Sequence, residues 1–260
     1  MSDNTSILVA AIALAGVVLA AIIAGGIKFY KILSNNQMRL EDTKNLVAKY
    51  RYPLAFAAID LQSRLSNILE GSFLNWRDNV EYGKKKNLYR YTSFLVGRYL
   101  TWAYIFRYAQ FLHARVQRDN KLTDTMRSIE STFTAMIYGG KPFWLWRGEQ
   151  MAIAELMAVK NENGEQFCIG FAEFDRKWDT DSDLKSWFDS LQADIKTLED
   201  SWARPRVAAR VGTGGFMQDQ RLRELQHLLI DLVESLDASK LDPDRSKKCV
   251  RAERCRCSTC

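Results

Sequence analysis

Residues 7–27 read ILVAAIALAGVVLAAIIAGGI, a run that contains no charged residue and no proline. A helix needs about 20 apolar residues to cross the hydrocarbon core of a bilayer, and in lipid its backbone polar groups must be satisfied within the segment. The run therefore predicts one transmembrane helix. It follows a short N-terminus, residues 1–6, which contains Asp3 and neither Lys nor Arg.

Basic residues begin directly after the apolar run, with Lys28 and Lys31. The positive-inside rule then places the N-terminus outside and the large C-terminal part in the cytoplasm. A cleaved signal peptide is the main alternative, but such peptides start with a basic region and carry an apolar core of about 7–15 residues. Gly16, Ala20 and Ala24 recur at every fourth position, which leaves open a homodimer through the membrane helix.

The composition allows a large folded part after the anchor. The chain has 260 residues, 47% of them hydrophobic, which is enough to bury the core of one large domain or two small ones. Its net charge of +6 is spread along the chain. This suits a protein beside an anionic lipid surface better than a nucleic-acid binder, whose charge gathers on one face. We expect the lipid bilayer and a cytoplasmic protein as partners, and no nucleic acid.

The spacing of apolar residues predicts a mainly α fold: one N-terminal transmembrane helix followed by a multi-helix domain. Residues 28–51 are expected to form a juxtamembrane helix or linker, residues 52–238 the cytoplasmic domain, and residues 239–260 a disordered basic tail. Pro53 suits the first turn of a new helix. Further helices are predicted over residues 94–112, 122–138, 149–159, 184–202 and 222–236.

The most apolar stretch of the domain, residues 94–112, reads FLVGRYLTWAYIFRYAQFL and follows an expected basic hinge at residues 83–86. Two arginines, Arg98 and Arg107, each cost about 2.5–3.5 kcal/mol near the centre of a membrane helix. The stretch therefore predicts a central core helix surrounded by other helices, rather than a second span. We expect both arginines to pair with acids or to stack on tyrosines.

The region from residue 158 to residue 202 contains two further signals. Asn163-Gly164 is a strong turn signal, and the flanking residues 158–160 and 166–171 can pair as a short hairpin or belong to a helix–loop–helix. Leu184, Trp187, Phe188, Leu191, Ile195, Leu198 and Trp202 then form one apolar stripe at helical spacing. Asp181 or Ser182 is expected to cap that helix.

Four of the five cysteines lie in the last twelve residues, at Cys249, Cys255, Cys257 and Cys260. Four thiolates can hold zinc, but this spacing does not divide into the two close pairs of a structural zinc site, so they are weak metal candidates. The neighbouring basic residues make these thiols reactive. Palmitoylation, disulfide formation and an unmodified tail stay open, and prenylation at Cys257 is a poor match because the next two residues are not aliphatic.

Arg147-Gly148-Glu149 opens a helix directly after the aromatic residues Phe143, Trp144 and Trp146. An arginine beside a helix N-terminus can hold an anion, so Arg147 and Glu149 are the candidate anion or partner contacts. The simpler alternative is that both serve the helix itself, with Glu149 complementing the helix dipole. The aromatic residues before them are expected to anchor the segment against the core.

The remaining candidates give weaker signals. His113 and His227 each lie on a predicted helix without the spacing of metal ligands, and Cys168 stands alone in an apolar run. Gly212–Gly215 lacks the lysine of a phosphate-binding loop. We therefore assign no catalytic, cofactor-binding or metal-binding residue, and we expect no cofactor.

Residues 50–69, YRYPLAFAAIDLQSRLSNIL, and residues 146–157, WRGEQMAIAELM, resemble segments of a family of membrane-anchored or soluble helical proteins of soil bacteria and fungi. The matching positions are Tyr50, Arg51, Pro53, Leu54, Asp60, Leu61, Gln62, Ser63, Arg64 and Leu65, and then Arg147, Gly148, Glu149, Gln150, Ala152, Ile153, Glu155 and Leu156. The resemblance extends loosely from Tyr50 to Leu236, and the cysteine tail departs from it. The family has no assigned activity, so the resemblance implies no catalytic residue.

These features favour a non-enzymatic interaction or scaffold protein with a single membrane helix. One alternative is a membrane-bound enzyme that acts on a lipid or a phosphorylated small molecule, in which Arg147, Glu149, Arg98 and Asp60 would converge in one cleft. A second alternative is a thiol or metal sensor that responds through the cysteines of the tail.

Overall fold

The computed structural model describes residues 30–31, 34, 48–69, 82–112, 120–138, 142–202 and 219–236. The chain divides into two compact units, residues 1–46 and 47–260. In the first unit the described residues Tyr30, Lys31 and Ser34 are helical. The predicted membrane span, residues 7–27, and the predicted tail, residues 239–260, lie outside the described residues. Within the described ranges, no helix has the length and apolar character needed to cross a bilayer.

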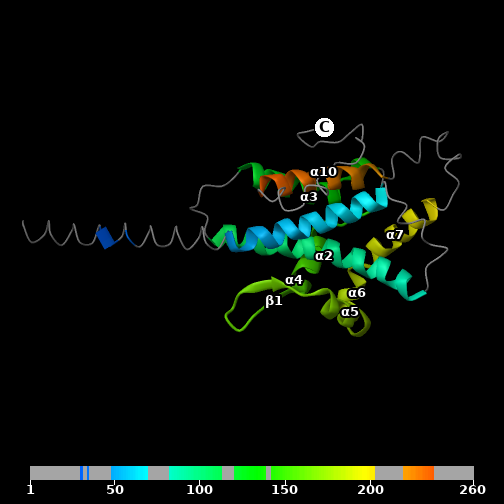
Figure 1. Ribbon diagram of the computed structural model, residues 1–260, viewed down its shortest axis with the longest axis horizontal. Coiled ribbons are helices and arrows are strands. Elements are labelled where there is room, and N and C mark those ends of the chain that lie inside the picture. The colour runs from blue at the N-terminus through cyan, green and yellow to red at the C-terminus, as the bar shows by residue number, and fades with distance from the viewer. Residues whose placement is uncertain are drawn as a thin grey trace, which may run out of the picture. The chain divides into compact units, whose positions relative to one another are not determined.

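The second unit is built mainly from helices, which confirms the predicted mainly α fold for the described residues (Figure 1). Its first helix spans residues 48–69. It is followed by α2 (Tyr82–Leu112), α3 (Asn120–Thr134), the 3₁₀ helix η2 (Met136–Tyr138), α4 (Arg147–Met157), β1 (Ala158–Lys160), β2 (Gln166–Cys168), α5 (Phe171–Thr180), α6 (Ser182–Ser186), α7 (Asp189–Trp202) and α10 (Gln220–Ser235).

The helix of residues 48–69 forms polar contacts with α2, the next described helix in the chain, and with α10, which lies far from it in the sequence. Asp60 accepts a hydrogen bond of 2.6 Å from Arg98 of α2, and the Gln62 side-chain oxygen accepts one of 3.2 Å from Gln226 of α10. Figure 1 shows this helix running alongside α2, with α10 and α3 paired beside it. The apolar residues of the same helix, including Leu61 and Leu65, are buried in the core.

The predicted start of a new helix at Pro53 is wrong, because the described helix already includes residues 48–52 and continues through the proline. Tyr50 is buried against Trp102, with ring centroids 6.3 Å apart. Arg51 donates from Nε to the backbone oxygen of Leu236 at 3.0 Å. These contacts anchor the turn before Pro53, so the tertiary structure stabilises a helix that the missing proline N–H weakens.

Helix α2 is the central element of this unit, as the apolar stretch at residues 94–112 predicts. It packs against α4, α5, α7 and β2, and Tyr99 and Phe106 are almost fully buried. The expected basic hinge at residues 83–86 is wrong, because these residues belong to α2. Three consecutive lysines are compatible with this outcome, since lysine is a good helix former.

The hairpin is the correct choice between the two structures that remained open for residues 158–171. Strands β1 and β2 pair antiparallel, with Ala158 opposite Cys168 and Lys160 opposite Gln166. Gly164 in the connecting turn has φ +78°, a conformation that glycine adopts without strain. The second strand ends at Cys168 and not at residue 171, because Phe171 begins helix α5.

The apolar stripe predicted as one helix from residue 184 to residue 202 is divided between α6 and α7. Asp181 caps α6, and its side chain accepts a hydrogen bond of 3.0 Å from the Leu184 N–H, as predicted. A turn then closes with a hydrogen bond from the Phe188 N–H to the Lys185 oxygen. Leu184 and Phe188 are buried, but Trp187, in this turn, is 39% exposed.

Three other predicted helices also differ, two of them in where they end and one in how far it is buried. The predicted helix over residues 122–138 ends at Thr134, and the following 3₁₀ turn buries Tyr138 and leaves Ile137 exposed. Helix α4 ends at Met157 instead of residue 159, because Ala158 begins β1. Helix α10 is buried on nearly all sides rather than on one apolar stripe.

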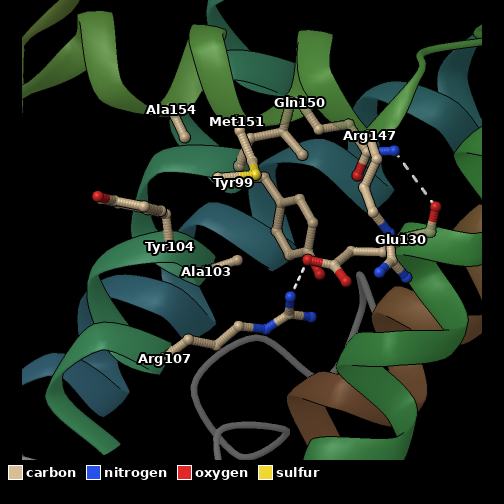
Figure 2. A pocket seen from close by; sticks show the side chains of 10 residues that line it. Tyr99, Ala103, Tyr104, Arg107, Glu130, Arg147, Gln150, Met151 and Ala154 are labelled. Atoms are coloured by element: carbon tan, nitrogen blue, oxygen red, sulfur yellow. Dashed lines mark hydrogen bonds and ion pairs between the residues drawn. The ribbon is translucent and has the colours of Figure 1, made fainter. Parts of the chain in front are cut away.

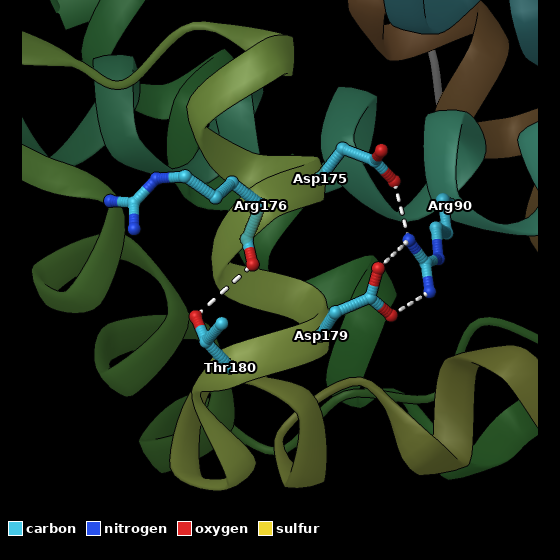
Figure 3. Close-up of polar contacts among 5 residues, drawn as sticks. All are labelled: Arg90, Asp175, Arg176, Asp179 and Thr180. Carbon is cyan, nitrogen blue, oxygen red and sulfur yellow. Dashed lines mark hydrogen bonds and ion pairs between the residues drawn. The ribbon is translucent and has the colours of Figure 1, made fainter.

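Helix α5 is fastened to α2 by a charged cluster (Figure 3). Arg90 of α2 donates to Asp175 at 2.6 Å and contacts both carboxylate oxygens of Asp179. Its guanidinium also lies over the ring of Trp178. Because the arginine side chain is largely buried and its two acids are half exposed, the cluster satisfies a charge at the edge of an aromatic core.

Candidate ligand pocket

A pocket of about 210 Å³ opens between α2, α3 and α4 (Figure 2). Its lining residues come from all three helices: Tyr99, Leu100, Ala103, Tyr104 and Arg107 from α2, Glu130 from α3, and Arg147, Gln150, Met151 and Ala154 from α4. On α2, Tyr99, Ala103 and Arg107 are spaced at i, i+4 and i+8, which places them on one face of the helix.

Close packing of α2 against α4 forms one side of this pocket. Gly97 makes the approach possible: a Cβ atom added there would lie 2.3 Å from the sulfur of Met157. At the other end of α4, the Leu145 N–H donates to the Phe133 oxygen at 3.2 Å. Gln150 donates from Nε2 to the backbone oxygens of Leu145 and Glu130. The first turn of α4 is thereby fixed to the end of α3.

The charged residues of the pocket give it a net positive charge. Arg107 forms an ion pair with Glu130, as the sequence predicted for an arginine within an apolar helix. Arg147 lies close enough for its charge to act on Arg107, and among the described residues no carboxylate pairs with it. Burial lowers the pKa of Arg107, the nearby Tyr99 opposes this effect, and the charges of Arg147 and Arg127 add to it, but a guanidinium stays protonated in proteins. Two positive charges and one negative charge therefore line the pocket.

Tyr99 brings a neutral hydrogen-bond donor into this group. The residue is only 1% exposed, and burial raises the pKa of its hydroxyl, so the hydroxyl is protonated at neutral pH. Figure 2 shows the ring directed toward Arg107 and Glu130. None of the described residues forms a hydrogen bond with this hydroxyl. Since the hydroxyl is not among the buried polar atoms that lack a partner, it reaches the pocket space, where it can donate to a molecule that enters.

The rest of the lining is largely apolar. Leu100, Ala103, Met151 and Ala154 surround the space beside the arginines. Met151 is 52% exposed, and Arg147 is also exposed, so both lie at the mouth. The pocket therefore combines a positively charged end with an apolar body, an arrangement that orients a ligand through a few polar groups.

The two residues predicted from the sequence as anion or partner contacts have different roles in the structure. Arg147 lines the pocket. The Glu149 carboxylate instead accepts a hydrogen bond of 2.5 Å from the backbone N–H of Trp146 and thereby caps α4. Glu149 thus serves its own helix, which is the simpler of the two alternatives.

The cleft suggested for Arg147, Glu149, Arg98 and Asp60 does not form at this pocket. Arg98 pairs with Asp60 at 2.6 Å, and neither of them lines the space beside Arg147. The arginine that does meet Arg147 is Arg107, which lies nine residues further along α2 than Arg98. The sequence could not show whether Arg98 or Arg107 lies beside Arg147, because both occur in the same apolar helix.

The other predicted candidates lie away from the pocket. Cys168 is half-buried, and burial raises the pKa of its thiol to about 12, so the reactive thiolate is scarce at neutral pH. His227 is buried within α10. Cys249, Cys255, Cys257 and Cys260, and also His113 and Gly212–Gly215, lie outside the described residues. In the described part of the chain, no group of three or more His, Cys, Asp or Glu side chains is placed to hold a metal ion.

Sequence reasoning missed Tyr99, Glu130 and Gln150 as parts of this site. The spacing of Tyr99 and Arg107 on one face of α2 is a signal that could have linked those two residues. Glu130 and Gln150 gave no local signal, because their positions depend on how α3 and α4 pack against α2.

Comparison with known proteins adds no further assignment. No protein family model, curated protein or solved structure matches this chain, so the resemblance of residues 50–69 and 146–157 to the soil bacterial and fungal family stays a prediction.

Proposed function

We propose that this chain is a single-pass membrane protein whose cytoplasmic helical domain acts by binding a protein partner rather than by turnover. The uncharged stretch at residues 7–27 and the basic residues after it support the membrane anchor and its orientation. The surface on which we base the protein partner lies within residues 47–260, which form one compact unit.

That surface comprises large apolar side chains of residues 136–137 and 144–146, which we call the aromatic edge: Met136, Ile137 and Trp146 are exposed, and Trp144 is half-buried. Trp146 is 57% exposed and Met136 is 67% exposed. Tryptophan and methionine are enriched at protein interfaces, and tryptophan is common among the residues that contribute most to binding. The exposed indole of Trp146 is the single observation that carries the proposal.

Contacts within the fold hold the aromatic edge in place. The Trp144 indole N–H donates to the Thr134 backbone oxygen at 3.3 Å, and the rings of Trp144 and Trp146 lie 4.9 Å apart. Leu145 and Phe143, on either side of Trp144, are fully buried. Because the surface is ordered before a partner arrives, binding loses less conformational entropy.

The charge beside the aromatic edge indicates the chemistry of the partner. Arg147 follows Trp146 directly and is exposed, with no carboxylate partner among the described residues. A partner segment that combines apolar side chains with an acidic residue would complement both groups.

Photo-cross-linking from the aromatic edge tests this function. Trp146 is replaced by p-benzoylphenylalanine in the full-length chain, and the variant is irradiated in its native membranes. Phe167 provides a matched control, because it is an aromatic residue of the hairpin with 40% exposure. We expect a discrete cross-linked protein from position 146 and none of the same mass from position 167. The same products from both positions, or none from position 146, would contradict the proposal.

The mass of the product also identifies the partner class. A species of twice the mass of the chain would indicate a second copy of this protein, which the ridge of Gly16, Ala20 and Ala24 leaves open. A heterologous mass would indicate a different partner, whose acidic segment can then be located by mass spectrometry.

A further inference from the structure

We propose that the pocket between α2, α3 and α4 binds a small organic acid, with the acid's carboxylate against Arg147 and the Tyr99 hydroxyl, and its hydrocarbon body in the apolar part of the pocket. This ligand goes beyond the proposed protein partner, and its test does not require that partner, although both would contact Arg147.

The positive end of the pocket has donors that the protein itself leaves available. The Arg107 guanidinium is already paired with Glu130. Arg147 lines the same space, and no carboxylate of the described residues pairs with it. A guanidinium is well suited to a carboxylate, because it can donate two parallel hydrogen bonds to the two oxygens.

Tyr99 supplies the second, independent indication of a ligand. Its side chain is buried from solvent yet lines the pocket, and its hydroxyl has no hydrogen-bond partner among the described residues. Both Tyr99 and Arg147 lie near enough to interact electrostatically with Arg107. A ligand oxygen placed between Tyr99 and Arg147 would give the hydroxyl the acceptor that the fold does not provide.

The charge of the pocket favours a carboxylate over a phosphate. Arg107, Arg147 and Glu130 together carry one net positive charge, which one carboxylate neutralises. A phosphate dianion would leave an excess negative charge next to Glu130, and this carboxylate would repel it. The largely apolar lining is also better matched to a hydrocarbon body than to a sugar or a second charged group.

The size of the pocket limits the acid. Its volume of about 210 Å³ is below the range of roughly 300–1,000 Å³ for drug-sized ligands, which favours a molecule similar in size to benzoate or hexanoate. Met151 and Arg147 are exposed at the mouth, so such a molecule can enter without separating the helices.

Binding of benzoate to the full-length chain in detergent, measured by isothermal titration calorimetry, tests this proposal. Benzyl alcohol has the same ring without the charge, and inorganic phosphate has the charge without the apolar body. We expect benzoate to bind at least about tenfold more tightly than either of them, because a charge-assisted hydrogen bond is strong in a partly buried site.

Three variants place the ligand in the pocket. R147Q is expected to weaken benzoate binding by about 10- to 100-fold, and Y99F by about three- to tenfold, since the second change removes a neutral donor. R127Q is the matched control, because Arg127 is exposed, pairs with Asp124 and does not line the pocket. We expect R127Q to bind benzoate within about twofold of the unchanged protein.

Several results would overturn the proposal. Equal affinity for benzoate and benzyl alcohol would show that the charge is not recognised, and preferential binding of phosphate would assign the pocket to phosphate or a lipid headgroup instead. Unchanged benzoate binding by R147Q would place the acid elsewhere. Should Y99F fail to fold because Tyr99 is buried, the R147Q and R127Q pair still decides the outcome, since both substitutions are at exposed residues.

Discussion

The packing of α2 against α4 can be tested with two matched glycine substitutions, Gly97→Ala and Gly148→Ala. Both glycines lie in helices. An added Cβ at Gly148 meets no atom within 4 Å, whereas at Gly97 it would lie 2.3 Å from the Met157 sulfur and 3.1 Å from the Phe188 ring. The two substitutions therefore change helix propensity in the same direction and differ in what the new methyl group contacts.

The magnitudes follow from these contacts. Replacing glycine by alanine within a helix is worth up to about 1 kcal/mol, so G148A should leave the free energy of unfolding unchanged or raise it. At Gly97 the same gain is opposed by overpacking, which typically costs about 1–3 kcal/mol, because Met157 is fully buried and has little room to move. We expect G97A to be less stable than G148A by about 2 kcal/mol.

Urea denaturation of the full-length chain in detergent, followed by tryptophan fluorescence, measures this difference. Shortening the methionine in the double variant G97A/M157A should recover part of the overpacking loss, although it opens a cavity of its own. Equal stability of G97A and G148A would refute the close approach of α2 and α4, and with it the arrangement of the pocket.

Three further predictions concern single residues. R221M should lower the free energy of unfolding by about 3 kcal/mol in urea, because Arg221 is fully buried and donates to two backbone oxygens; R127M, at an exposed site, should change it by less than about 0.5 kcal/mol. Burial raises the pKa of Cys168 from 9.0 to about 12, so the stabilisation from its neutral thiol is complete below pH 9 and is lost as the pH rises toward 12. Between pH 9 and pH 10 the free energy of unfolding of C168A should therefore fall by about 1 kcal/mol less than that of the unchanged protein, measured by urea denaturation at each pH. E149Q should lower stability by up to about 1 kcal/mol through a weaker cap of α4 yet leave benzoate affinity within about twofold, measured by denaturation and calorimetry, and a large loss of affinity would show that Glu149 contacts the ligand.

The sequence predicted the elements of this fold wherever local signals and tertiary packing agree. Residues 94–112 are apolar on most sides and form the buried centre of α2. Asp181 has the position of a cap and accepts from the Leu184 N–H. The Asn163-Gly164 signal marks the turn of a hairpin, because glycine adopts the positive φ that the turn requires.

Errors arose where packing overrides a local signal. Pro53 favours a helix start, but the helix continues through it because Tyr50 and Arg51 are held by residues far away in the sequence. The stripe from residue 184 to residue 202 has the period of one helix, yet a turn near Phe188 divides it, with Leu184 and Phe188 buried and Trp187 exposed. Period alone does not detect such a break, since the apolar spacing is preserved across it.

The candidate pocket could be predicted only in part for the same reason. Arg147 was identified because it stands at the beginning of a predicted helix. Its neighbours Tyr99 and Glu130 come from two other helices, and their approach depends on the packing of α3 and α4 against α2. Three helices that meet in space leave no common motif in the sequence.

Methyl NMR on the full-length chain is the most direct test of organic acid binding in this pocket. The methyl groups of Met151, Ala103 and Ala154 line the space, whereas the buried Met126 of α3 does not. Added benzoate should shift the three pocket methyl signals along one common saturation curve, leave the Met126 signal in place, and lose this effect in R147Q. Unchanged pocket signals at saturating benzoate, or shifts of the same size at Met126, would contradict the assignment of the pocket to an organic acid.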